Sequence, residues 1–208
     1  MILYATKLTY DRFSIEKKYA SMLTDDEKML REAAIKKDSG DPLYEWAVKL
    51  FYFDGKKCLA CTNFATKFTI FIINIHADEV LSSNVIIYEY IVDMFRDDDE
   101  FFPYLADYLN SSPFSFFAPL KDKSGISSVN RVISDFAIDG YRFYDYISDG
   151  ILHTKKINYD ANFDYICSVK IDNRREYIYP GEFFRETVMN RFRKPDNILY
   201  FHKADEEQ

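Results

Sequence analysis

Two cysteines have the spacing of a reactive motif. Cys58 and Cys61 form a CxxC pair, an arrangement that can bind zinc or exchange disulfides. They fall in a segment with the pattern of a β-strand, where residues three positions apart point to opposite faces. No second CxxC pair is present, and Cys167 stands alone. We therefore expect buried structural cysteines and predict neither a metal nor a cofactor, with a metal or redox site as the alternative.

His76 and Asp78 are the weak candidates for acid–base chemistry. They lie where a predicted strand ends and a predicted helix begins, a position at which a site can form. No HExxH, GxSxG, glycine-rich phosphate loop or EF-hand pattern accompanies them. We predict no catalytic residue and lean toward a protein that is not an enzyme. An enzyme with an unfamiliar site near His76 remains the alternative.

Four consecutive carboxylates stand at Asp97, Asp98, Asp99 and Glu100. The net charge of the chain is -7, and residues 41–150 carry most of the acidic excess. Such a run splays around the start of a helix and makes a poor cation cage, so capping and solubility are one interpretation. Our leading hypothesis is a non-enzymatic binding or accessory protein that acts through this acidic surface. One form of it is a phage- or mobile-element-encoded inhibitor of a nucleic-acid-binding protein.

Basic residues concentrate near the C-terminus, where tyrosines lie among them, as in some proteins that bind single-stranded nucleic acid. This pattern predicts a second alternative, a nucleic-acid-binding surface on an arginine-rich last helix. A helix that balances the acidic middle of the same chain explains the pattern equally. The arginines concerned are Arg174, Arg175, Arg185, Arg191 and Arg193.

The element that organises the chain is a predicted sheet over residues 43–75. Alternating polar and apolar residues over 44–52 indicate a half-buried strand. Asp54-Gly55 then favours a two-residue hairpin turn into a return strand over 56–62. After a turn at 63–66, the apolar run 67–75 predicts an internal strand that is covered on both faces.

Helices and further strands are expected around this sheet. Residues 15–37 look helical, with a capping box at Thr24 and Glu27, but their charge suggests a mobile or only partly buried segment over 15–40. In a helix over 78–95 the core side falls on Leu81, Val85, Tyr88, Val92 and Phe95. The other predicted helices cover 97–109, 127–146 and 182–193, and the other strands cover 1–6, 151–157, 163–171 and 177–179.

Together these elements predict an α+β fold with an antiparallel-rich sheet, a mixed sheet being the alternative. We expect one domain over residues 1–203 and a disordered tail over 204–208. No apolar run is long enough for a membrane span. The odd number of cysteines and the absence of a secretion signal indicate the cytoplasm. A protein partner is expected, and the oligomeric state stays open.

Three segments resemble a bacterial and archaeal family of unknown function, domain of unknown function 6933. They are Asp41 to Trp46, Asn63 to Ile70 and Lys123 to Asn130. The likeness covers residues 1–145 approximately. It implies an α+β domain, and it implies no activity.

Overall fold

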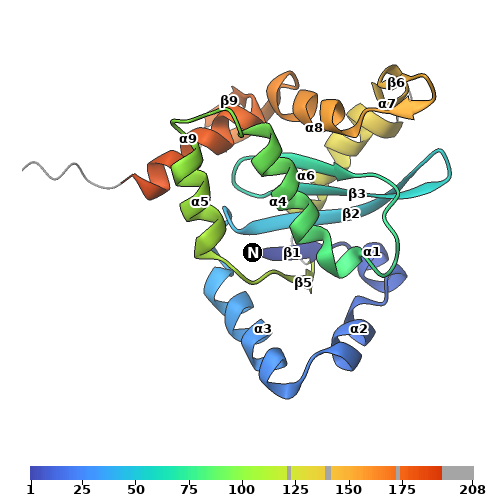
Figure 1. Ribbon diagram of the computed structural model, residues 1–208, viewed down its shortest axis with the longest axis vertical. Helices are drawn as coiled ribbons and strands as arrows, with labels where there is room; N and C mark the ends of the chain where they lie inside the picture. Colours follow the sequence, from blue (N-terminus) through green and yellow to red (C-terminus); the bar gives the residue numbers. More distant parts are fainter. Residues whose placement is uncertain (121–122, 139–141, 172–173, 194–208) are drawn as a thin grey trace, which may run out of the picture.

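The computed structural model describes residues 1–120, 123–138, 142–171 and 174–193 (Figure 1). Within these residues the main sheet has five strands in the order β4-β3-β2-β1-β5. The strands are β1 (Ile2–Ala5), β2 (Glu45–Phe53), β3 (Lys56–Asn63), β4 (Thr69–Ile72) and β5 (Phe116–Pro119). β2, β3 and β4 are antiparallel, whereas β1 runs parallel to both β2 and β5. The α+β prediction is confirmed, and the sheet is mixed. The predicted tail at 204–208 lies outside the described residues.

The hairpin of β2 and β3 forms as its turn residues predict. Asp54 and Gly55 have φ angles of 47° and 73°, and Phe53 pairs with Lys56. Two positive φ values in a two-residue loop are typical of a type I′ turn. Cys58 and Cys61 are both buried, and they belong to the cores on opposite sides of the sheet. The alternation argument for these cysteines is therefore confirmed.

The turn between β3 and β4 is organised by the Asn63 side chain. Its Oδ1 accepts hydrogen bonds from the backbone N–H groups of Ala65 at 3.1 Å and Thr66 at 3.0 Å, while its Nδ2 donates to the Leu43 carbonyl at 2.9 Å. The chain then passes through Lys67 in the left-handed region, with φ at 63°. β4 consequently begins two residues later than predicted, at Thr69, and it ends at Ile72 rather than at residue 75.

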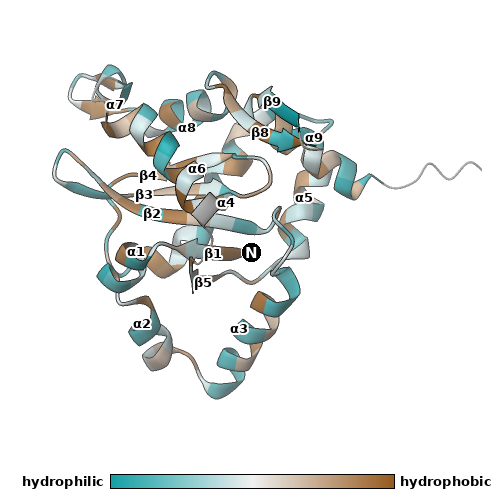
Figure 2. Cartoon of the chain, turned by 180° about the vertical axis from the view of Figure 1, so that it is seen from behind, coloured by the Kyte–Doolittle hydropathy of each residue, from teal (hydrophilic) through white to brown (hydrophobic). Residues whose placement is uncertain are grey.

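Helices cover both faces of the sheet. On one face, Trp46 and Leu59 belong to a core shared with α4 (Ser83–Met94), which follows the 3₁₀ turn η1 (Val80–Ser82), and with α5 (Phe102–Ser111) and α9 (Pro180–Phe192). On the other face, Phe71 packs with α6 (Lys123–Ile133), the π-helical turn η2 (Ser134–Ile138), α7 (Arg142–Asp145) and α8 (Thr154–Phe163). α4 lies in front of the strands in Figure 1, and α6 lies in front in the reverse view of Figure 2. Hydrophobic residues concentrate in the strands between them (Figure 2).

Side chains from helices cover both edges of this sheet. At β4, Asn162 exchanges two hydrogen bonds with the backbone of Thr69, and Asn158 does the same with Phe71, at N–O distances of 2.7–3.0 Å. At β5, the Phe117 N–H donates to the Tyr19 hydroxyl of α2 (Ile15–Met22), and the Phe117 carbonyl accepts from Arg31 of α3 (Asp25–Asp38), both at 2.9 Å. Unpaired strand edges promote association with other strands, and here both edges are blocked.

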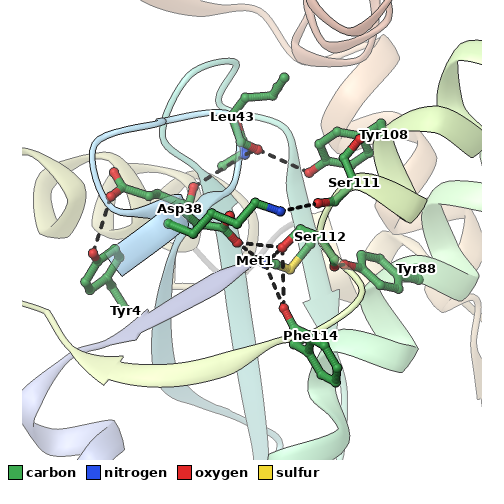
Figure 3. A network of polar contacts seen from close by, with 12 residues as sticks. Met1, Tyr4, Asp38, Leu43, Tyr88, Tyr108, Ser111, Ser112 and Phe114 are labelled. Carbon is green, nitrogen blue, oxygen red and sulfur yellow. Dashed lines mark hydrogen bonds and ion pairs between the residues drawn. The ribbon is translucent and has the colours of Figure 1, made fainter. Parts of the chain in front are cut away.

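The N-terminal ammonium group joins β1 to two helix ends (Figure 3). It is buried and lies 2.7 Å from a carboxylate oxygen of Asp38 at the end of α3. It also contacts the Ser112 hydroxyl and donates to the Phe114 carbonyl at 2.9 Å. Burial lowers the pKa of this amine, and Asp38 opposes that shift. The predicted capping box of Thr24 and Glu27 starts α3, and residues 15–38 form two helices, α2 and α3, separated at residues 23–24. Hydrogen bonds that join Tyr19 and Arg31 to Phe117 attach these helices to β5.

The strand predicted over residues 151–157 is wrong, and the strand predicted over 163–171 is shorter than expected. Residues 151–157 are not a strand, because only Ile151–Leu152 (β7) pairs, with Ile147–Ser148 (β6), and α8 then begins at Thr154. The buried face of α8 combines Ile157 and Ala161 with the two asparagines, so half of its helical stripe is polar and was not recognised. The strand predicted at 163–171 shortens to Cys167–Ile171 (β8), which pairs with Arg174–Ile178 (β9).

The core side predicted for residues 78–95 is correct only in part. Phe95 is buried, and Leu81 and Tyr88 pack against the core, as predicted. Val85 is 49% exposed, and the buried residues of the helix are Ser83, Ile87 and Ile91. Most residues of this helix are apolar, so spacing alone cannot select the stripe that faces the sheet. The last helix, by contrast, is confirmed over Pro180–Phe192. The short helix α1 (Lys7–Arg12) connects β1 to α2.

Candidate functional site

Negative charge gathers in the layer formed by η1, α4 and α5. Residues 76–112, here called the acidic layer, contain nine carboxylates and one cationic side chain, Arg96. The net charge of this layer is therefore -8, whereas that of the whole chain is -7. α4 and α5 lie on the same side of the sheet (Figure 1). The nine are Asp78, Glu79, Glu89, Asp93, Asp97, Asp98, Asp99, Glu100 and Asp107.

Two of the four predicted binding carboxylates have structural partners. Arg185 of α9 donates to Asp98 and to Glu100, in each case at 2.7 Å. Asp98 also accepts the Phe101 N–H at 3.0 Å, which holds the turn that leads into α5. The hydrogen bond from Arg185 lowers the pKa of Asp98, so this carboxylate stays charged in the folded protein. Asp98 and Glu100 thus help to dock α9 on the acidic layer.

Most of the remaining carboxylates face solvent. Asp93 pairs with Arg96 at 2.6 Å and with Lys155 at 2.9 Å. The other six are exposed, and none forms an ion pair with a cation in the part of the chain that the structure describes. They are Asp78, Glu79, Glu89, Asp97, Asp99 and Asp107. The structure therefore leaves Asp97 and Asp99, of the predicted run, available to a partner.

His76 lies on the surface of the protein. Its side chain is exposed, and its backbone N–H donates to Glu79 at 3.0 Å. It does not line any of four well-defined cavities among the described residues, and Asp78 beside it is also exposed. The geometry therefore offers no support for an acid–base site at these two residues.

The five arginines of the predicted nucleic-acid surface lie on different elements. Arg185 and Arg191 of α9 are engaged in ion pairs with carboxylates of this chain, Arg191 with Asp41. Arg193 follows the end of that helix. Arg174 and Arg175 are exposed on the β8–β9 hairpin. Arg185 and Arg191 thus fit the interpretation in which the last helix balances acidic groups of its own chain.

A polar cavity of about 520 Å³ near α8 was missed in the sequence. Its lining includes Ser148, whose hydroxyl lies 2.6 Å from Nε2 of His153. Nearby, Tyr146 donates to Asp160 at 2.6 Å, and burial together with this bond raises the pKa of the phenol. His153 precedes α8, and the wrongly predicted strand hid this position. A serine and a histidine within hydrogen-bond distance can form the first part of a nucleophilic catalytic site, in which a third group orients the histidine. Among the described residues, no carboxylate accepts a hydrogen bond from His153.

The three segments that carry the family likeness meet at one corner of the sheet. Phe64 donates its backbone N–H to the Glu45 carbonyl at 2.9 Å, which joins the first segment to the second. Gly125 packs so closely on Phe64 that a Cβ atom would come within 2.8 Å of the ring, which joins the third. The model of the family described as Domain of unknown function (DUF6933) matches residues 2–183. The chain belongs to this family.

The match to DUF6933 extends beyond the segments that first suggested it, through α8 and into the first turn of α9. No curated protein and no solved structure matches the chain. Among the residues described, no helix combines the length and apolar character needed to cross a membrane. Nor do the described residues contain a group of three or more His, Cys, Asp or Glu side chains placed to hold a metal ion.

Proposed function

We propose that this DUF6933 member is a non-enzymatic binding protein whose acidic layer binds a basic protein. The observation that carries the proposal is the set of six exposed carboxylates on this layer that form no ion pair within the described part of the chain. Clustered charge of one sign attracts a partner of the opposite sign and speeds association in a salt-dependent way. A nucleic-acid-binding protein has such a basic surface, and occupying it would inhibit nucleic-acid binding.

Asp98 and Glu100 stabilise the fold, so the test of binding must leave them unchanged. Neutralising Asp98 or Glu100 removes a partner of Arg185, so loss of binding in such a variant would not be informative. Glu89, Asp97, Asp99 and Asp107 form no ion pair with any residue that the structure describes. The test variant therefore combines Glu89→Gln, Asp97→Asn, Asp99→Asn and Asp107→Asn.

A matched control removes the same charge from other surfaces. Glu32→Gln, Asp164→Asn, Glu176→Gln and Glu186→Gln change four exposed carboxylates outside residues 76–112 that form no ion pair within the described structure. Wild-type protein, test variant and control are immobilised, exposed to a cell extract and eluted with salt. We expect wild type and control to retain the same basic protein and the test variant to lose it.

The retained protein is then purified, and its nucleic-acid binding is measured by mobility shift. Wild type and control should inhibit the shift in a salt-sensitive way, and the test variant should not. Equal retention by the test variant and wild type would refute the proposal. Equal loss in test variant and control would also refute it, because binding would then follow net charge rather than the acidic layer.

A further inference from the structure

A small cationic cavity lies on the opposite side of the sheet from the acidic layer. It has a volume of about 200 Å³ and is bounded by the β3–β4 turn, α6 and β8. Sites for drug-sized ligands occupy roughly 300 Å³ or more, so this cavity suits a small polar group. Its polar lining consists of Thr62, Lys67, Ser127, Ser128, Arg131, Tyr165, Cys167 and Ser168.

Two cations border the cavity. The guanidinium of Arg131 lies 3.9 Å from Asp135, too far for a hydrogen bond, and it donates to no residue in the described part of the chain. Lys67 is the second cation, and its Nζ lies 2.8 Å from the Phe64 carbonyl. Both residues line the cavity together with the buried Cys167.

The backbone presents Lys67 to this cavity at an energetic cost. Its φ of 63° is in the left-handed region, which costs a side-chain-bearing residue roughly 1 kcal/mol. The Asn63 carbonyl accepts the Lys67 N–H at 3.1 Å and helps to hold this conformation. Strained residues of this kind cluster at functional sites.

Hydroxyl groups complete the lining. Ser127, Ser128 and Ser168 form no side-chain hydrogen bond with the residues that the structure describes. Tyr165 donates to Asp135, which directs that carboxylate toward the phenol. Burial raises the pKa of Cys167 to about 11, so the thiol is neutral at physiological pH and adds no negative charge.

We propose that this cavity binds the phosphate group of a small phosphate monoester. An arginine supplies a planar pair of donors for phosphate oxygens, a lysine adds a point charge, and serine hydroxyls donate to the remaining oxygens. Lys67 belongs to the second family-like segment, and Ser127 and Ser128 belong to the third, so the folding of this corner builds the site. The proposal does not depend on the acidic layer.

The test is calorimetric titration of the full chain with inorganic phosphate and with glycerol phosphate, against sodium chloride of equal ionic strength. We expect both phosphates to bind and chloride not to. Tighter binding of glycerol phosphate would identify the monoester as the ligand, and equal binding would identify free phosphate as sufficient. No heat beyond that of chloride would overturn the proposal.

Two variants locate the binding. Arg131→Gln should weaken it at least about tenfold, the value of one charged hydrogen bond. Lys67→Gly should weaken it similarly while leaving thermal stability unchanged or higher, because glycine adopts the left-handed conformation without strain. Lys170→Gln and Arg175→Gln on the exposed hairpin are the matched controls and should bind like wild type. Wild-type affinity in both Arg131→Gln and Lys67→Gly would refute the assignment.

Discussion

Replacing Asn162 by alanine should destabilise the fold far more than the same change at an exposed asparagine. Asn162 is fully buried, and its amide makes one hydrogen bond to the N–H and one to the carbonyl of Thr69 on the edge of β4. Asn158 repeats the arrangement at Phe71. Residues four apart on a helix rise about 6.0 Å, and residues two apart on a strand about 6.7 Å, so helix and strand stay in register over this pair.

The size of the effect follows from what alanine leaves behind. The N–H and the carbonyl of Thr69 would each lose their partner in a site that water does not reach. An unsatisfied buried group costs about 1–3 kcal/mol, so the two together cost about 2–6 kcal/mol. Alanine recovers no more than about 0.7 kcal/mol through its higher helix propensity. The net loss is a large part of the 5–15 kcal/mol that is typical of a folded domain.

Urea unfolding monitored by circular dichroism measures this loss in the free energy of unfolding. Asn190→Ala is the matched control, because Asn190 is exposed on α9, and its change should stay within about 0.5 kcal/mol. Asn162→Asp is a second comparison that keeps the acceptor for the Thr69 N–H but removes the donor to its carbonyl. A loss below about 1 kcal/mol for Asn162→Ala would show that the asparagine does not carry the edge of β4.

Two further predictions concern buried polar groups. Asp38→Asn leaves the N-terminal ammonium without its charged partner, so it should lower the free energy of unfolding in urea by about 3 kcal/mol. Asp26→Asn, on the exposed start of the same helix, is the control and should cost far less. Equal losses in the two variants would contradict this reasoning. Burial and the bond to Asp135 raise the pKa of Tyr165, so the folded state keeps this proton above pH 10, where an unfolded tyrosine loses it. Stability should therefore fall as pH rises above about 10, and Tyr165→Phe should make the fall shallower in unfolding curves at pH 8–11; an unchanged slope would show that Tyr165 titrates normally.

Local sequence patterns predicted much of the secondary structure, but they did not predict which strands pair across long stretches of the chain. The Asp54-Gly55 turn specifies its hairpin within a few residues, so β2 and β3 were found. The parallel partners of β1 lie about 40 and 110 residues away, and nothing in their own composition marks the pairing. α8 was missed because two of its core residues are asparagines that hydrogen-bond to a strand.

For the candidate sites, too, the sequence shows local features but not the contacts between distant residues. The acidic run at 97–100 is visible in the sequence, but the ion pairs of Asp98 and Glu100 depend on Arg185, more than 80 residues later. The small cavity is assembled from the β3–β4 turn, the middle of α6 and the start of β8. The first two belong to family-like segments, but their sequences do not indicate that they meet each other and β8 around one cavity. Charge density is a local property of a sequence, whereas convergence of side chains is a property of the folded chain.

The covered edges of the main sheet also restrict how this protein is recognised. Some partners bind by adding a strand to an exposed edge and reading main-chain groups that every sequence possesses. Here the groups of Thr69, Phe71 and Phe117 are already occupied by side chains from α8, α2 and α3. Strand addition at either edge would therefore require these side chains to be displaced first.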